Sequence, residues 1–101
     1  MEISISTKET GEIIAALKGR LDTLQAAECE KQLAPLHENT DKNILIECSG
    51  LEYISSSGLR IFLGLLKDVR SKGGSLVLKN VNNEIRNIFT ITGFHKLFNI
   101  E

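Results

Sequence analysis

The sequence predicts a single α/β domain over residues 1–101, with a mixed β-sheet and packed helices. The expected order is β-β-α-β-α-β-α, followed by a C-terminal tail. An alternating segment and a returning apolar segment at the start indicate a hairpin. Two later apolar segments are short and rich in branched residues, and amphipathic helical patterns separate them. Strands that alternate with helices along a chain are typical of a sheet that contains parallel strands.

The first two strands are expected over "EISIST" (residues 2–7) and "EIIAALKG" (residues 12–19), joined by the turn "KETG". Ile3 and Ile5 alternate with polar residues, as in an antiparallel strand with one solvent-exposed face. The two segments therefore predict a hairpin that packs one face on the core.

Asp22 and Thr23 are N-cap candidates for a first helix over about residues 24–36. Pro35 is expected to end or kink this helix, because its ring clashes one turn back and it donates no hydrogen bond. One apolar stripe is expected to face the core. Its members are Ala26, Cys29, Leu33 and Leu36.

The apolar run "ILIEC" (residues 44–48) is typical of a central strand covered on both faces. A second helix is expected over about residues 58–71, and Gly73 suits the left-handed position after it. "SLVLKN" predicts another strand. Asn82 or Asn83 then caps a third helix that ends at Gly93 and places Ile85, Ile88 and Phe89 on one face. "FHKLFNIE" supplies a last apolar element of unassigned type.

Composition excludes several classes of function. The formal net charge is -1 with no basic block, which argues against a nucleic-acid partner. No apolar run approaches the ~20 residues of a membrane helix, so we expect a cytoplasmic protein without direct membrane insertion. Cys29 and Cys48 are expected to be small buried thiols. His37 and His95 have no metal ligand at suitable spacing, so no metal and no cofactor are expected.

The stretch "EYISSSGLRIF" (residues 52–62) places three serines before a helical pattern. The expected core face of that helix consists of Leu59, Phe62, Leu63, Leu66 and Val69. The opposite face is expected to carry Ser57, Ile61, Gly64 and Asp68. An isoleucine and a glycine on a solvent-exposed stripe indicate a surface that a partner approaches, because glycine inside a helix costs about 1 kcal/mol relative to alanine. The alternative is an ordinary serine N-cap and a single exposed isoleucine.

The serines do not form a catalytic motif. A hydrolase nucleophile elbow needs G-x-S-x-G, and Ile54 and Ser55 stand where the first glycine belongs. The glycine-rich phosphate-binding loops are absent. We therefore expect no enzyme, with a serine hydrolase kept as the remote alternative.

The segment from "ILIECSGLEYISSSGLRIF" to "ITGFHKLFNIE" resembles the second half of a STAS domain of the bacterial anti-sigma factor antagonists. "GRLDTLQAAECE" matches the G-x-L-D segment of that family. The resemblance implies the STAS fold over nearly the whole chain. It also implies a module that binds an anti-sigma factor with serine kinase activity when unphosphorylated, and that a PP2C-type phosphatase restores after phosphorylation.

The resemblance assigns the phosphoacceptor to Ser57 and a position near the kinase contact to Asp22. In the family pattern an aspartate precedes the two serines, and Ser55 stands in its place here. That departure opens Ser56 or Ser55 as the acceptor, with Ser56 as the fallback. It also leaves open a STAS domain that is never phosphorylated and serves as a scaffold subunit of a transporter or stress-signalling complex. The candidate partner-binding residues are Asp22, Thr23, Ser55, Ser56, Ser57, Gly58, Arg60, Ile61, Gly64 and Asp68.

Overall fold

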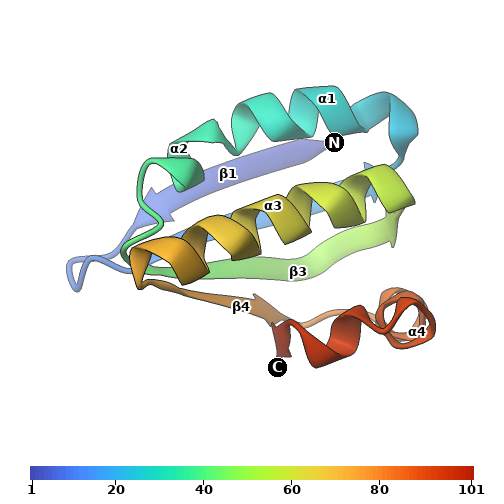
Figure 1. Ribbon diagram of the computed structural model, residues 1–101. Helices are drawn as coiled ribbons and strands as arrows, with labels where there is room; N and C mark the ends of the chain where they lie inside the picture. Colours follow the sequence, from blue (N-terminus) through green and yellow to red (C-terminus); the bar gives the residue numbers. More distant parts are fainter.

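The computed structural model describes residues 1–101. Its elements in chain order are β1 (Glu2–Thr7), β2 (Ile13–Leu21), α1 (Thr23–Gln32), α2 (Ala34–His37), β3 (Asn43–Ile54), α3 (Ser56–Lys72), β4 (Ser75–Lys79), α4 (Asn83–Thr92), the 3₁₀ turn η1 (Phe94–Lys96) and β5 (Asn99–Ile100) (Figure 1). The predicted order is confirmed, with a second short helix and a short final strand added to it.

The five strands form one mixed sheet in the order β1-β2-β3-β4-β5. β1 pairs antiparallel with β2 and places Ile3 opposite Leu17, which confirms the predicted hairpin. The expected core face holds only in part, because Ile3 is half-buried whereas Ile5 is exposed. All other neighbouring strands are parallel. Because parallel strands end at the same edge of a sheet, β2, β3 and β4 all deliver the chain to one edge, where α1, α3 and α4 begin.

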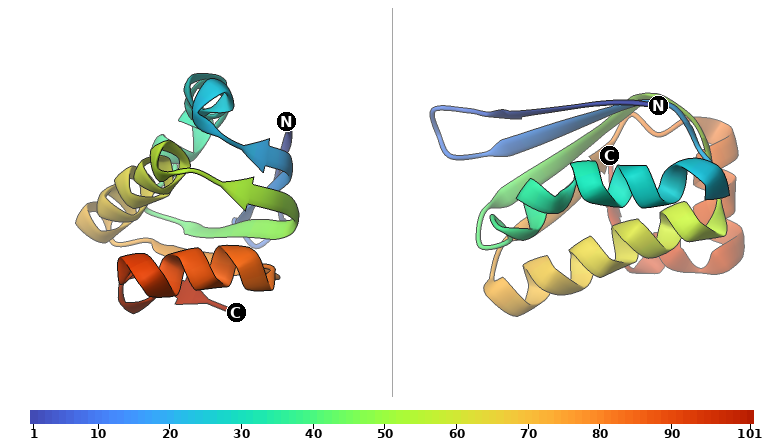
Figure 2. Two further views of the ribbon diagram at one scale, coloured as in Figure 1. Left: turned by 90° about the vertical axis from the view of Figure 1, so that its right-hand side faces the viewer. Right: turned by 90° about the horizontal axis from the view of Figure 1, so that it is seen from above.

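The helices α1, α2 and α3 lie over one face of the sheet, as the two views of Figure 2 show. β3 accordingly alternates buried residues such as Ile44 and Ile46 with half-buried ones such as Leu45 and Glu47. The prediction that residues 44–48 are covered on both faces is therefore wrong. The same strand also continues six residues further, because its second half pairs with the end of β2 up to Leu21 and Ile54.

The predicted helix over residues 24–36 is interrupted at Leu33, before the proline. The N–H of Leu33 donates to Cys29 O at 2.9 Å, and Pro35 then stands in the first turn of α2. Proline is tolerated there because the first-turn N–H groups have no partner within a helix. The expected stripe of Ala26, Cys29, Leu33 and Leu36 is nevertheless entirely buried, so the break preserves the core face.

Several predicted helix ends are confirmed by the capping geometry. Asn82 caps α4, with its Oδ1 accepting from Ile85 N at 2.8 Å. Gly73 and Gly93 follow α3 and α4 with φ of 85° and 78°, the left-handed conformation that glycine adopts without steric cost. The tail returns to the core, where Phe98 packs edge-on against Phe89 at 5.4 Å between ring centroids.

Gly74 offers a test of this packing. A Cβ at this position would meet the carbonyl oxygens of Thr40 and Lys42, closer than any real contact. We expect Gly74→Ala to lower the free energy of unfolding by about 1–3 kcal/mol, the range for overpacking. A thermal melt checks this, with roughly 4–8 °C lost per kcal/mol in a domain of this size. Gly64→Ala is the matched control, because a Cβ there meets nothing within 4 Å. Equal melting temperatures for the two variants would contradict the prediction.

Candidate functional site

The starts of α1 and α3 lie side by side at the edge where β2 and β3 end. The backbone N–H of Ser55 donates to Leu21 O at 2.8 Å, which ties the two chain segments together. Asp22, which follows Leu21, is the predicted N-cap of α1, and its Oδ1 accepts a hydrogen bond from Gln25 N at 3.0 Å. Asp22 is half-buried and Thr23 is the exposed first residue of α1. The structure therefore brings the Asp22 segment and the serine segment together.

The three serines occupy three different positions. Ser55 is the N-cap of α3: its backbone is extended, and its Oγ accepts from Gly58 N at 3.2 Å. It is only 9% exposed. Ser56 and Ser57 are the first two residues of the helix, exposed and half-buried respectively. The helix expected over about residues 58–71 therefore begins two residues earlier, at Ser56, because Ser55 provides the cap.

The hydroxyl groups of Ser56 and Ser57 make no side-chain hydrogen bond inside the protein, whereas that of Ser55 does. Their backbone N–H groups belong to the first turn of α3, and the N–H groups of a first turn have no hydrogen-bond acceptor within the helix. The 17-residue α3 also presents the positive end of its dipole here. Two unbonded hydroxyls thus stand in an environment that favours negative charge.

Gly58 has an internal reason to be glycine. A Cβ at Gly58 would lie 2.7 Å from Leu21 Cγ and 2.8 Å from Ile54 Cγ1. The missing side chain therefore lets the start of α3 approach the ends of β2 and β3. Gly58 is buried, so it shapes the site through packing.

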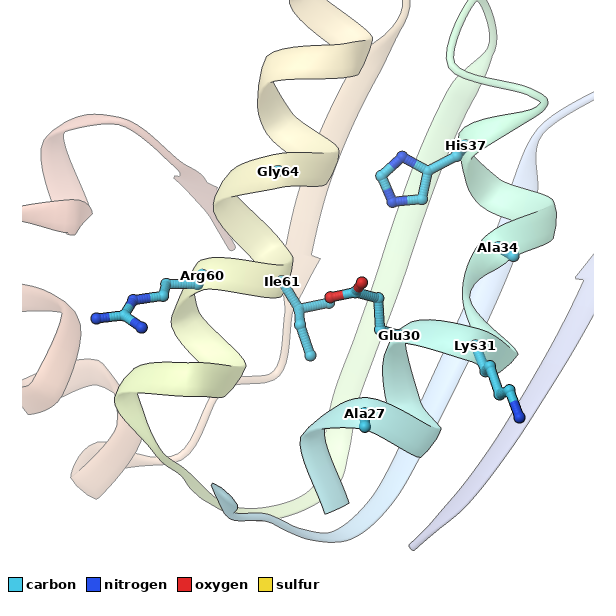
Figure 3. Close-up of a pocket in the computed structure, with 8 residues that line it drawn as sticks. All are labelled: Ala27, Glu30, Lys31, Ala34, His37, Arg60, Ile61 and Gly64. Atoms are coloured by element: carbon cyan, nitrogen blue, oxygen red, sulfur yellow. The ribbon is translucent and has the colours of Figure 1, made fainter. Parts of the chain in front are cut away.

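A groove of about 490 Å³ runs between the α1–α2 pair and α3 (Figure 3). Its lining combines small residues, one isoleucine and several polar side chains. The residues are Ala27, Glu30, Lys31, Ala34, His37, Arg60, Ile61 and Gly64. In Figure 3 the Glu30 carboxylate points across the groove toward Ile61, whereas Arg60 and Lys31 extend away from it. The Glu30 carboxylate therefore lies in the middle of the groove, and the two cationic side chains lie at its margins.

Ile61 corrects one prediction. It was expected on the exposed face of α3, but it is 7% exposed and belongs to the core cluster. The cause is that α3 packs against both the sheet and the α1–α2 pair, so its buried arc is wider than one stripe. Leu65 is buried on this arc, while Leu63, predicted to be core, is half-buried. Ile61 is thus part of the groove lining and not a free side chain.

Gly64 differs from Gly58, because nothing in the fold requires it. A Cβ at Gly64 would meet no atom within 4 Å, and the residue has ordinary helical backbone geometry. With Ala27 and Ala34 on the facing helices, it leaves the groove without bulky walls. Glycine at this position destabilises the helix by about 1 kcal/mol relative to alanine, and no packing contact inside the domain offsets that cost.

Asp68 lies further along α3, and its Oδ2 is 2.5 Å from the Nδ1 of His37 on α2. The side chains are 48% and 35% exposed, so the pair sits at the surface between the two helices. The sequence expectation treated His37 as an isolated residue. The partner was not recognisable from sequence, because the two residues are 31 positions apart.

Sequence reasoning also missed Leu24. It is 88% exposed at the start of α1, two residues after Asp22. A signal was present, since a leucine stands outside the stripe that begins at Ala26. A single exposed apolar side chain is normal on a protein surface, so Leu24 adds an apolar group beside Asp22 without by itself defining an interface.

The two cysteines take no part in this site. Burial raises the pKa of Cys29 to about 11 and that of Cys48 to about 12, with nearby Glu30 and Glu47 adding to the respective shifts. Both are therefore protonated, unreactive thiols at neutral pH. No three His, Cys, Asp or Glu side chains come together as a metal site would need. None of the helices combines the length and apolar character of a membrane-spanning segment.

Comparisons with known proteins address the family and the fold of the chain. The family described as the STAS domain matches residues 4–101. BtrV of Bordetella bronchiseptica is 34% identical to the chain, covering 90% of it and 78% of its own length. The anti-sigma-B factor antagonist of Bacillus subtilis is 31% identical, covering 99% of this chain and 92% of its own length.

Two solved structures share the fold. A protein of Thermotoga maritima superposes with a TM-score of 0.86 at 21% identity, covering 97% of this chain and 84% of its own. The Bacillus cell fate determinant SpoIIAA, in its phosphorylated form, gives 0.73 at 17% identity, covering 99% and 91%. At these identities the likeness establishes the architecture, and the resemblance seen in the sequence is confirmed.

Proposed function

The chain belongs to the STAS domain family, and on that premise we propose that it is an anti-sigma factor antagonist. In this proposal the unphosphorylated chain binds an anti-sigma factor that is also a serine kinase, and phosphorylation of Ser57 ends the binding. A PP2C-type phosphatase restores the binding form. The chain acts in the cytoplasm as a binding module without catalysis of its own.

One observation supports this function most directly. The unbonded hydroxyl of Ser57 stands in the first turn of α3, one helical turn before Ile61, which lines the groove together with Gly64. A modifiable group and a surface shaped for close approach thus share one helix. The names of the Bacillus subtilis relative and of phosphorylated SpoIIAA agree with this reading.

The proposed switch acts at the interface. The oxygens of a phosphate on Ser57 accept hydrogen bonds from the free N–H groups at the start of α3, and the positive end of the helix dipole stabilises their charge. The fold therefore tolerates the phosphate. The added charge is about -1.5 to -2 at neutral pH. A partner docked over Ser57 would have to desolvate or oppose that charge, which is the basis of release.

Ser57 is the proposed acceptor and Ser56 the fallback. The hydroxyl of Ser55 is already bonded to Gly58 N and is nearly buried, which disfavours it as an acceptor. Ser55, which stands at the position of the family aspartate, caps the helix without a carboxylate charge. We propose that the partner covers Asp22, Thr23 and Arg60 around this acceptor.

The runner-up function is a STAS scaffold subunit that is never phosphorylated, and the serine at position 55 is the observation in its favour. A serine hydrolase has less support. His37 is paired with Asp68, and His95 Nδ1 lies 3.3 Å from Phe89 O, so neither histidine contacts a serine. Labelling of a serine by a fluorophosphonate probe would support the serine hydrolase function.

Intact-mass measurement of the chain purified from its native cells tests the proposal. We expect a population heavier by one phosphate, and a gain of one phosphate on incubation with the co-purified kinase and ATP. Treatment with a PP2C-type phosphatase should remove it. A single unmodified mass under all conditions would favour the scaffold function.

The aspartate mimic of phosphoserine separates a change at the interface from unfolding. Ser57→Asp is expected to fold like the parent, because a carboxylate in the first turn of a helix stabilises by about 0.3–1 kcal/mol. It is expected to bind the kinase partner poorly, since the new charge faces the docked surface. Thermal melts and titration calorimetry measure the two effects. Ser56→Asp is the matched control with equal charge. Unfolding of Ser57→Asp, or binding equal to the parent, would contradict the interface mechanism.

A further inference from the structure

The hydrogen-bonded pair of His37 and Asp68 spans from α2 to α3 at the end of the groove away from Ser57. Asp68 lies eleven residues after Ser57 on the same helix, which is about 16 Å at 1.5 Å per residue. His37 lines the groove, and in Figure 3 its ring points from α2 toward α3. The ring therefore crosses the gap between the two helices near Gly64.

Stability alone gives little reason for this pair. The two side chains are 35% and 48% exposed, and exposed pairs of this kind contribute about 0–1 kcal/mol. α2 is held in place without it, because Leu33 and Leu36 on either side of Pro35 are fully buried. The pair fixes the direction of the imidazole ring, and this ring forms the boundary of the groove.

We propose that Asp68 is a positioning residue: it holds His37 across the gap and so sets where the groove ends. Asp68 then contributes to partner binding through His37 and not by touching the partner. This inference rests on the proposed function and refines it, because Asp68 was first assigned a direct contact. Because the ring is already fixed, the His37 side chain loses less conformational entropy when the partner binds.

A double-mutant cycle in partner binding tests the inference. The proteins are the parent, His37→Ala, Asp68→Ala and the double variant, each titrated with the purified kinase partner. We expect each single substitution to weaken binding by about three- to tenfold, the cost of ordering or losing one side chain. In the His37→Ala background, Asp68→Ala should have no further effect, because the residue it orients is gone.

Two further measurements separate positioning from general damage. Asp68→Asn keeps an oxygen that accepts from the imidazole N–H, so it should bind the partner as the parent does. In NMR, the long-range couplings of the His37 ring should report one tautomer with its proton on Nδ1 in the parent. The same ring should show a mixture of tautomers in Asp68→Ala.

The outcomes are distinct. Asp68→Ala weakening binding equally with and without His37 would mean a direct partner contact, and would overturn the inference. Equal binding by all four proteins would overturn it as well, while leaving the proposed function intact. A parent chain that fails to bind the kinase partner would remove the proposed function, and this inference with it.

Discussion

Replacing Ser57 by alanine is expected to abolish phosphorylation of the chain by its kinase partner. Alanine has no hydroxyl to accept the phosphoryl group, and the hydroxyl of Ser55 is engaged in the helix cap. The fold should be unaffected, because Ser57 is half-buried and its hydroxyl makes no side-chain hydrogen bond. We expect the free energy of unfolding to change by no more than about 0.5 kcal/mol, as for an ordinary surface substitution. Peptide mapping after incubation with kinase and ATP measures the result.

Each neighbouring serine supplies a control for this variant. Ser56→Ala should remain a substrate, since it keeps the proposed acceptor and removes only an exposed hydroxyl. Ser55→Ala should also remain a substrate but should lose about 1 kcal/mol of stability, because it removes the N-cap. Undiminished phosphorylation of Ser57→Ala would overturn the assignment and transfer it to Ser56. That result would follow from exposure, since Ser56 is the more accessible of the two.

The predictable features of the fold are those that a few neighbouring residues determine. Asn82 caps its helix, and Gly73 and Gly93 end theirs, because capping depends on the three or four residues around it. The hairpin was equally recognisable from the alternation at Ile3 and Ile5. The length of β3 was not, since its second half is a strand only because β2 pairs with it.

The site was predictable only where it depends on chain-local geometry. The serine motif marks the start of α3, yet its pattern does not say which serine is the cap. Ile61 was misplaced because helical periodicity gives one face, whereas α3 packs on two sides. The pairing of His37 with Asp68 depends on how α2 returns over α3, which no local pattern encodes. Contacts between distant segments are therefore what the structure adds.

The two glycines of α3 show why the groove has a role outside the fold. Gly58 is required internally, because any side chain would collide with Leu21 and Ile54. Gly64 has no such neighbour, so the loss of helix propensity at that position has no internal explanation. An external explanation remains, namely that a partner approaches the bare backbone between α3 and the α1–α2 pair. That explanation makes the two glycines respond in opposite ways to substitution.

Gly64→Gln is accordingly expected to weaken binding of the kinase partner while raising the thermal stability of the chain. Glutamine forms helix better than glycine by about 0.5 kcal/mol, and its side chain meets open space. In a domain of this size that gain is worth roughly 2–4 °C in melting temperature. The same side chain fills the groove beside Ile61 and keeps the partner from close approach. We expect a loss of about tenfold or more, which corresponds to about 1.4 kcal/mol of binding free energy.

Gly64→Ala completes the test, because it separates helix propensity from bulk. Alanine should raise stability by about 1 kcal/mol, more than glutamine does, yet it adds only a methyl group to the groove. If the groove receives the partner, binding should fall in the order glycine, alanine, glutamine while both variants melt higher than the parent. Calorimetric titration and melting curves on the same samples give both quantities. Lower melting temperatures with unchanged binding would instead make Gly64 a packing residue of the domain, and would remove the groove from the partner interface.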